Sequence, residues 1–200
     1  MDIAIKPLIP ELATDYFDFF ENRAFTDDSP YRCYCQMFQM SKAQHQVACE
    51  KYEGIDPGDA LRKIAEQQIE TGILQGYLAY VDGLSIGWCN ANNRANYPSD
   101  PQHDVPFHAS AKKREKAVVC FEISPDYRGK GVATALLQQV IADAKSEGYV
   151  AVVGFPVIRE RRYEWDNHGP MRLFEKSGFV KALEQGGRMV MKKELMTTYQ

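Results

Sequence analysis

Two features near the middle of the chain could do chemistry together: a turn rich in glycine and cations, and a carboxylate just upstream of it. The turn is Arg128-Gly129-Lys130-Gly131, and the carboxylate is Glu122. Glycines let an anion approach the main chain closely. The start of a helix adds four unpaired N–H groups and about half an elementary positive charge. If a helix begins here, the turn predicts a site for an anion, most simply a pyrophosphate.

The flanking sequence predicts a strand before the turn and a helix after it. Val118 to Ile123 is an apolar, β-favouring run, and Pro125 ends it because proline fixes φ. After the turn, apolar residues recur at helical spacing on one face, at Val132, Leu136, Val140 and Ala144. Gly148 stands where a left-handed cap would end this helix.

The common nucleotide-binding motifs do not fit this turn. The Walker pattern requires Ser or Thr after Gly-Lys, which is absent here, and the dinucleotide fingerprint requires Gly or Ala where the chain has Thr134. An ordinary strand-to-helix loop that needs glycine for its geometry remains an alternative.

A different motif does match. Arg128, Gly131 and Ala133 form R-x-x-G-x-A between the predicted strand and helix, and the segment 167–179 reads N-H-G-P-M-R-L-F-E-K-S-G-F. In both motifs and in their order, the chain resembles the GNAT superfamily of acyl-CoA-dependent N-acetyltransferases. The resemblance extends over roughly Gly76 to Leu195.

The resemblance implies an acetyl-CoA-dependent N-acetyltransferase that acts on a primary amine of a small molecule or a protein, with acetyl-CoA as co-substrate and no metal. A non-catalytic sensor module that binds acyl-CoA or CoA is the alternative. The implied coenzyme contacts come from the central strand, the turn and the second motif. They are Phe121, Ile123, Arg128, Gly129, Lys130, Gly131, Val132, Ala133, Thr134 and Asn167.

The proton-transfer groups are less clearly marked. Glu122 is the ionisable side chain within the central strand, and strict alternation would place it on one face with Cys120 and Val118. It could instead point to solvent or pair with an arginine. Tyr163 and His168 are secondary candidates. Phe174 stands where the family often has a tyrosine that protonates the leaving thiolate, so another donor serves or the thiolate leaves unassisted.

We expect one α/β domain spanning residues 1–200. The resemblance implies a central, mostly antiparallel sheet with one parallel, splayed strand pair and helices on both faces. Residues 22–75 read as a helical insert on the substrate side, and residues 76–195 as the acyl-CoA-binding core. The insert could shape specificity or an oligomer contact, which leaves a homodimer open.

Composition excludes several classes of protein. The net charge of −3 gives no overall basic footprint for nucleic acid. No run of apolar residues is long enough to span a membrane, and the N-terminal residues do not read as a signal peptide. We therefore expect a cytoplasmic protein with neither a nucleic-acid nor a membrane partner and with reduced cysteines.

Three further groups of residues invite interpretation. Tyr31, Tyr34, Trp88 and Asn90 could line a substrate pocket or simply fill the core. A second alternative is a zinc site, because the spacing C-x-C-x9-H-x3-C occurs at Cys33, Cys35, His45 and Cys49, although C-x-C is tighter than usual. The charged run 112–116 reads as solvated surface.

Overall fold

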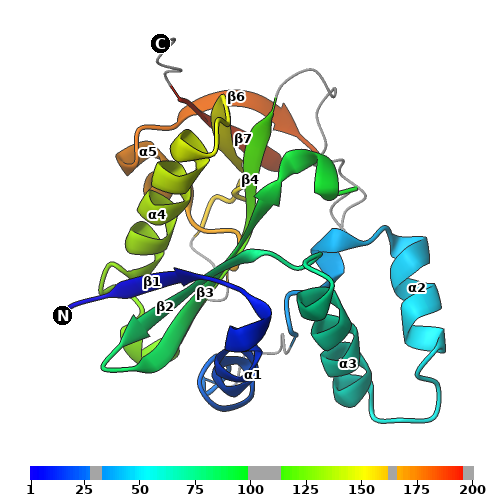
Figure 1. Cartoon of the computed structure of the whole chain (residues 1–200). Helices are drawn as coiled ribbons and strands as arrows, with labels where there is room; N and C mark the ends of the chain where they lie inside the picture. Colours follow the sequence, from blue (N-terminus) through cyan, green and yellow to red (C-terminus); the bar gives the residue numbers. More distant parts are fainter. Residues whose placement is uncertain (28–32, 99–113, 162–165, 196–200) are drawn as a thin grey trace.

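The computed structural model describes residues 1–27, 33–98, 114–161 and 166–195. Its centre is a seven-stranded sheet in the order β1-β2-β3-β4-β5-β7-β6 (Figure 1). The strands are β1 (Ala4–Pro7), β2 (Gly76–Val81), β3 (Leu84–Asn93), β4 (Glu115–Ile123), β5 (Ala151–Gly154), β6 (Val180–Gln185) and β7 (Arg188–Glu194).

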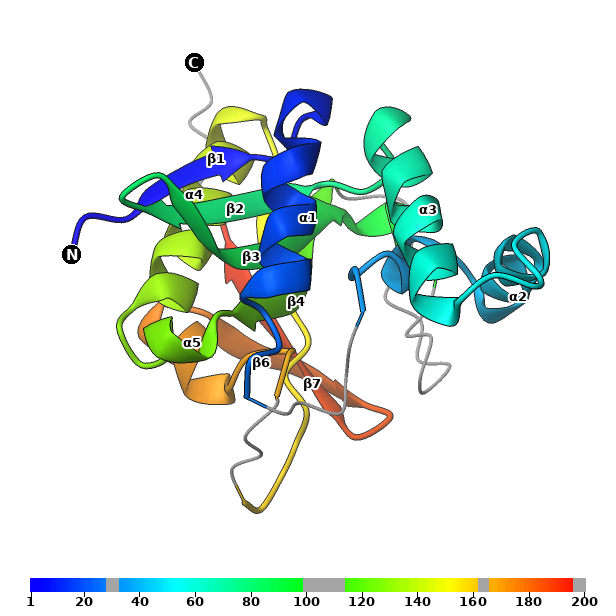
Figure 2. The same cartoon turned by 90° about the horizontal axis from the view of Figure 1, so that it is seen from below.

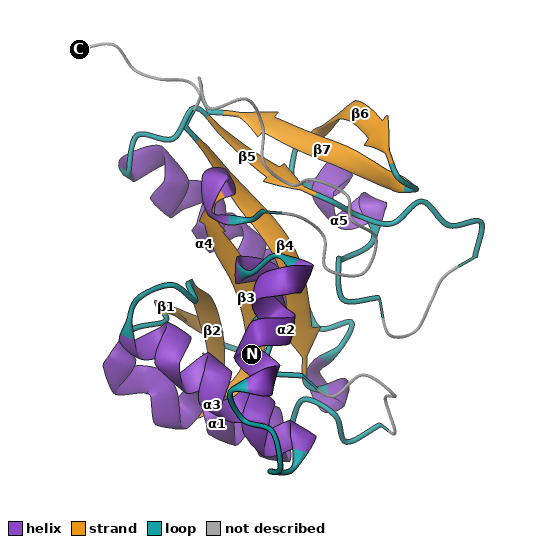
Figure 3. Ribbon diagram, turned by 90° about the vertical axis from the view of Figure 1, so that its right-hand side faces the viewer, coloured by secondary structure: helices purple, strands orange, loops and turns teal. Residues whose placement is uncertain are grey.

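The sheet is mixed, with one parallel pair. β4 and β5 run parallel with Glu115 opposite Ala151 and Val118 opposite Gly154, and the remaining neighbours pair antiparallel. β4 joins the two halves of the sheet, with β1–β3 on one side and β5–β7 on the other (Figure 3). The expected α/β fold class is therefore confirmed.

The described residues include five α-helices, of which α1 and α4 cover opposite faces of the sheet (Figure 2). Their bounds are α1 (Ala13–Asn22), α2 (Lys42–Glu50), α3 (Pro57–Glu70), α4 (Val132–Ser146) and α5 (Met171–Lys176). The predicted stripe of α4 is buried throughout, so this helix is held by the burial of its apolar face.

Each face of the sheet has its own core. On the α1 side, Tyr16, Phe20 and Trp88 pack together, with Trp88 fully buried. On the α4 side, Leu136 and Val140 pack with Phe174 and with residues of β2, β3 and β5. Gly76 is required under the first core, because a Cβ there would lie 2.4 Å from the Trp88 ring.

The helices α2 and α3 lie between β1 and β2 in the sequence, and α2 stands at the side of the molecule away from the sheet (Figure 1). Both helices begin at side-chain caps: Ser41 forms a capping box with Gln44, and Asp56 accepts hydrogen bonds from Gly58 and Asp59. None of the described helices is long and apolar enough to span a bilayer.

One expectation from the charge pattern was wrong. Within the run 112–116, Glu115 and Lys116 are not solvated but buried, as the first two residues of β4. Glu115 binds Arg94 and Lys192, and Lys116 donates to Glu147. The strand extends to Glu115 because these partners neutralise the charges as they enter the sheet.

Candidate functional site

The candidate site lies where β4 and β5 stop pairing. Their ladder ends at Val118 and Gly154, although β4 continues to Ile123 against β3. After Gly154 the chain follows β7 instead, and Val157 pairs with Arg188. The β5-side edge of β4 is thus left without a partner strand beyond Val118, which is the divergence that the resemblance implied.

A loop from the second motif, which contains Asn167, binds to part of that edge of β4. The Phe121 amide donates to the Asn167 carbonyl at 2.6 Å, and the Asn167 amide nitrogen lies 3.8 Å from the Cys120 sulfur. Ile123 is two residues further on, so its amide faces the same edge. No main-chain carbonyl among the described residues accepts from Ile123. The Phe121 amide is therefore occupied, and the Ile123 amide donates to the neighbouring Glu122 carboxylate.

The turn before α4 presents a row of main-chain donors. Gly131 caps the helix with φ +88°, a left-handed conformation that glycine adopts without strain. Within the described chain, no acceptor lies in hydrogen-bonding geometry to the amides of Gly131, Val132, Ala133 or Thr134; the first helical bond runs from Ala135 to Gly131. These four donors and the helix dipole are the features that an anion site requires, and they lie at the turn singled out in the sequence.

Glu122 lies at the same end of β4, on the face covered by α1. Strict alternation placed it with both Cys120 and Val118, and half of that expectation was wrong. The pairing of β3 with β4 shifts between Asn90 and Ala91, which leaves Val119 as a bulge. The bulge turns Val118 into the α4-side core and keeps Cys120 on the α1 side.

The Glu122 side chain, 15% exposed, belongs to a three-residue chain of charges. Arg128 donates from Nη2 to Glu122 at 3.4 Å, from Nη1 to Asp27, and from Nε to the Ile123 carbonyl at 3.0 Å. Asp27 follows α1 in sequence, and loop composition had given no reason to single it out. The guanidinium thus points back over the end of β4, so Lys130 is the more exposed of the two cations predicted to bind the anion.

The electrostatics of this group suit proton transfer. Burial raises the pKa of Glu122 to about 7. The positive charge of Arg128 opposes this rise, and the negative charge of Asp27 adds to it. A carboxylate with this pKa is protonated and ionised in comparable amounts near neutral pH, as a general base requires. A buried carboxylate with a strongly shifted pKa also marks a candidate functional site.

Both ring nitrogens of His168 are engaged in hydrogen bonds within the protein. Its Nδ1 lies 2.8 Å from the Val119 carbonyl and its Nε2 lies 3.0 Å from Arg188 Nη2. Since the guanidinium can only donate, Nδ1 carries the proton and Nε2 accepts. The Nδ1 bond thus holds the loop to β4 at the bulge, and the Nε2 bond holds it to Arg188 at the start of β7. The other secondary candidate, Tyr163, lies outside the described residues.

Phe174 is buried against the strand that diverges. Its ring lies so close to Gly154 that a Cβ there would stand 2.1 Å from Cε1, and it meets the Phe179 ring at 5.3 Å. The side chain fills the α4-side core and has no proton to donate. Gly154 therefore lacks a side chain because Phe174 takes that space.

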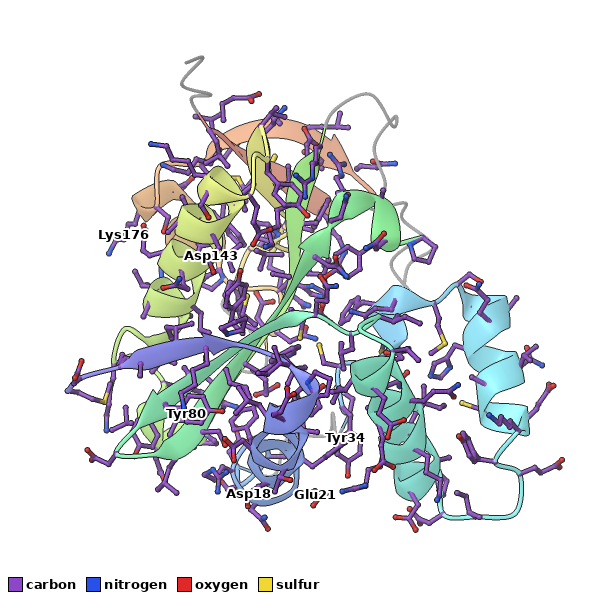
Figure 4. The ribbon with its side chains drawn as sticks, in the orientation of Figure 1. Asp18, Glu21, Tyr34, Tyr80, Asp143 and Lys176 are labelled. Atoms are coloured by element: carbon purple, nitrogen blue, oxygen red, sulfur yellow. The ribbon has the colours of Figure 1, made fainter. Side chains whose placement is uncertain are left out.

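The residues expected to line a substrate pocket divide between core and surface. Trp88 is fully buried against Tyr16. Asn90 is also fully buried; it accepts from Gln39 and Tyr97 and donates to the Cys35 carbonyl. Tyr34 lies near α1, where its hydroxyl donates to Glu21 (Figure 4). Tyr31 falls outside the described residues.

The cysteine pattern does not assemble as a zinc site. In the part of the chain that the structure describes, no group of three or more His, Cys, Asp or Glu side chains could hold a metal ion. His45 lies 3.8 Å from the Cys49 sulfur, whereas the Cys35 sulfur accepts from Asn90 at 3.3 Å. Cys35 and Cys120 lie in the core on the α1 side.

Comparison with known proteins bears on the whole arrangement. The sequence model of the Acetyltransferase (GNAT) family matches residues 34–179, which is most of the chain. That stretch contains β4, the turn and the second motif. No curated protein sequence matches the chain.

Solved structures share the fold at low identity. A GNAT-family acetyltransferase from Listeria monocytogenes superposes with a TM-score of 0.57 at 13% identity, over 96% of this chain and 95% of that one. PaiA N-acetyltransferase from Thermoplasma acidophilum, in complex with coenzyme A, gives 0.51 at 16%, over 97% and 99%. The NatC complex bound to Gag peptide and CoA contains a chain that gives 0.51 at 15%, over 98% and 100%.

Proposed function

Since the chain belongs to the Acetyltransferase (GNAT) family, we propose that it transfers the acetyl group of acetyl-CoA to a primary amine, either of a small molecule or of a protein. Two of the solved structures that share its fold contain coenzyme A. The observation that carries the proposal is the row of four open amides at Gly131–Thr134, next to a β4 edge that β5 has left.

In this proposal the amides of Gly131–Thr134 hold the coenzyme pyrophosphate, and Lys130 adds charge at the surface. The edge of β4 that β5 has left takes the acyl-pantetheine arm as a strand-like partner. Asn167, which already occupies the Phe121 amide, sets the limit of that edge. The thioester is then fixed beside Glu122, and fixing both reactants can supply much of the rate enhancement.

Glu122 is the proposed general base. The acceptor enters as an ammonium with an ordinary pKa near 10, and its proton passes to the Glu122 carboxylate directly or through water. The neutral nitrogen attacks the thioester carbonyl, the C–N bond forms, the C–S bond breaks and CoA leaves. The products are the N-acetyl amine and CoA, and Glu122 returns its proton to solvent.

The leaving thiolate receives no help from Phe174. A thiol has an ordinary pKa near 8.5, so its thiolate is a moderate leaving group without a donor. We infer that CoA leaves as the thiolate or takes a proton from another group. Replacement of the usual tyrosine alters the proton relay, while the coenzyme site and base stay in place.

The first experiment measures thiol release from acetyl-CoA with a panel of amines, with mass spectrometry of the acceptor. Acetylated amine and stoichiometric CoA are expected. Coenzyme binding with no turnover for any amine would favour the sensor alternative.

Gly131→Glu tests the coenzyme turn. We expect calorimetric titration to show at least about a hundredfold weaker CoA binding, because a carboxylate would face the phosphates. Gly83→Glu is the matched control: Gly83 also has positive φ, at +80°, and open space at its Cβ position, but lies in the β2–β3 turn. It carries the same charge and strain and should bind CoA normally. Equal affinity in both variants would contradict the assignment.

A further inference from the structure

Asp27, Arg128 and Glu122 make an unequal set of charges: two carboxylates share one guanidinium. Arg128 donates from Nη1 to Asp27, from Nη2 to Glu122 and from Nε to the Ile123 carbonyl. All three nitrogens of its guanidinium are therefore engaged. The Asp27 and Arg128 side chains are 18% and 28% exposed, so solvent screens the group only in part.

The two carboxylates hold Arg128 unequally. Asp27 makes a close ion pair, whereas Glu122 lies at 3.4 Å, which is long for a charge-assisted hydrogen bond. The other Asp27 oxygen, Oδ1, is buried, and no described residue donates to it. Among the described residues, Arg128 is thus the group that holds the Asp27 carboxylate.

We propose that Asp27 is a positioning residue for the acetyl transfer: by drawing the Arg128 guanidinium to itself, it leaves Glu122 free enough of that cation to act as the base. This inference rests on the proposed function and deepens it. In this inference the effect of Asp27 on the reaction passes through Arg128, with which it forms an ion pair.

The ionisable groups around Glu122 come from several elements. Asp27 follows α1, Arg128 precedes α4, Cys33 lies in the segment before α2, and Cys120 is on β4. Both thiols have raised pKa values, that of Cys33 at about 12 because of burial, so they stay neutral near pH 7. Beyond the effect of burial, the charged neighbours that act on Glu122 are therefore Arg128 and Asp27.

Asp27→Asn removes the charge and keeps the shape. The asparagine oxygen can still accept from Arg128, but the uncompensated guanidinium would move toward Glu122 and lower its pKa by about one unit. The weaker base should also reduce the limiting rate about threefold, if half of the lost basicity is expressed in the transition state. Asp27→Glu restores the charge and should recover part of both quantities.

The test follows the carboxyl carbon of Glu122 by NMR across pH in the free protein, and the pH dependence of acetyl transfer in parallel. The free-protein titration needs no activity, so it separates this inference from the proposed function. Asp126→Asn is the matched control, because Asp126 is an exposed carboxylate beside the same turn. It should leave the Glu122 titration within about 0.2 units.

A double-variant cycle decides whether Asp27 acts through Arg128. In the Arg128→Gln background, Asp27→Asn should shift the Glu122 midpoint less than it does in wild type, because the moving cation is gone. Equal shifts in both backgrounds, or no shift in wild type, would overturn the inference. A clear shift in the free protein without any acetyl transfer would uphold the charge arrangement and refute the proposed function.

Discussion

β4 carries a glutamate near each end, Glu115 and Glu122, and the two side chains lie in contrasting surroundings. At the first end, Glu115 is 6% exposed and lies where β4 pairs with β5. At the other end, Glu122 is 15% exposed and lies where β5 has left. Both side chains belong to the same strand and are largely shielded from water, yet their pKa values shift in opposite directions.

The number of cations explains the difference. Burial would raise the pKa of Glu115, but hydrogen bonds from Lys192 at 2.9 Å and Arg94 at 2.6 Å outweigh it, and the pKa is lowered. Glu122 shares one more distant guanidinium with Asp27, so burial wins and the pKa rises. Burial alone therefore does not decide the charge of a carboxylate; the balance of partners does.

The same contrast separates stability from chemistry. The Glu115 end joins strands β4 and β7 through paired charges and has little left to offer a ligand. The Glu122 end has open main-chain donors and a carboxylate that can exchange a proton near neutral pH. The variants below test this division, beginning with the largest expected effect.

Glu122→Gln should lower turnover by a factor of about 100 or more, because the amide cannot accept a proton in the reaction. Coenzyme affinity, measured by calorimetry, should stay close to that of wild type. Glu115→Gln removes a carboxylate from the same strand and should leave the turnover number of the folded enzyme nearly unchanged. Similar losses in both variants would erase the distinction between the two ends.

Glu115→Gln should instead lower the free energy of unfolding by roughly 2 to 3 kcal/mol at pH 7, because Arg94 and Lys192 each lose an ion pair with this buried carboxylate. The pKa of Glu115 is lowered on folding, so its stabilisation is present above the ordinary pKa and disappears as pH falls through the lowered one. Denaturant titrations should thus show a smaller penalty in acid.

Glu184→Gln is the control for that measurement, because Glu184 is an exposed carboxylate on β6. Its effect should stay within about 0.5 kcal/mol. A Glu115 penalty that did not exceed this, or that grew in acid, would show that the buried ion pairs contribute nothing.

Stability at the other end should have the opposite pH dependence. The pKa of Glu122 is raised from 4.5 to about 7, so the folded state is penalised as pH rises through that interval. Relative to Glu122→Gln, wild type should lose about 3 kcal/mol of unfolding free energy between pH 4 and pH 8. A constant difference between the two proteins would mean that Glu122 titrates normally.

The sequence was sufficient for the elements around the site because local chemistry specifies them. Gly131 indicates a positive φ, and Pro125 ends the strand. The apolar stripe from Val132 to Ala144 gives α4 its buried face. The mostly antiparallel sheet and the divergence of its parallel pair came from the resemblance, and the strand order came only from the structure, since pairing across a sheet leaves little mark in a single sequence.

The electrostatic detail was beyond sequence reasoning for a physical reason. Asp27 and Arg128 are far apart in the chain and meet only because α1 and the turn before α4 lie at the same end of β4. The bulge at Val119 has no glycine or proline to signal it. Glu115 and Lys116 read as solvated because their counter-charges, on Lys192 and Glu147, also come from distant elements.

The most direct test of the whole account is a two-dimensional ¹⁵N NMR titration of the protein with coenzyme A. The amides of Gly131, Val132, Ala133 and Thr134 should show the largest shifts, together with that of Ile123, whereas those of residues 115–118 should barely move. Binding that left the α4 turn unperturbed, or that shifted the Glu115 end instead, would contradict the assignment of the coenzyme site.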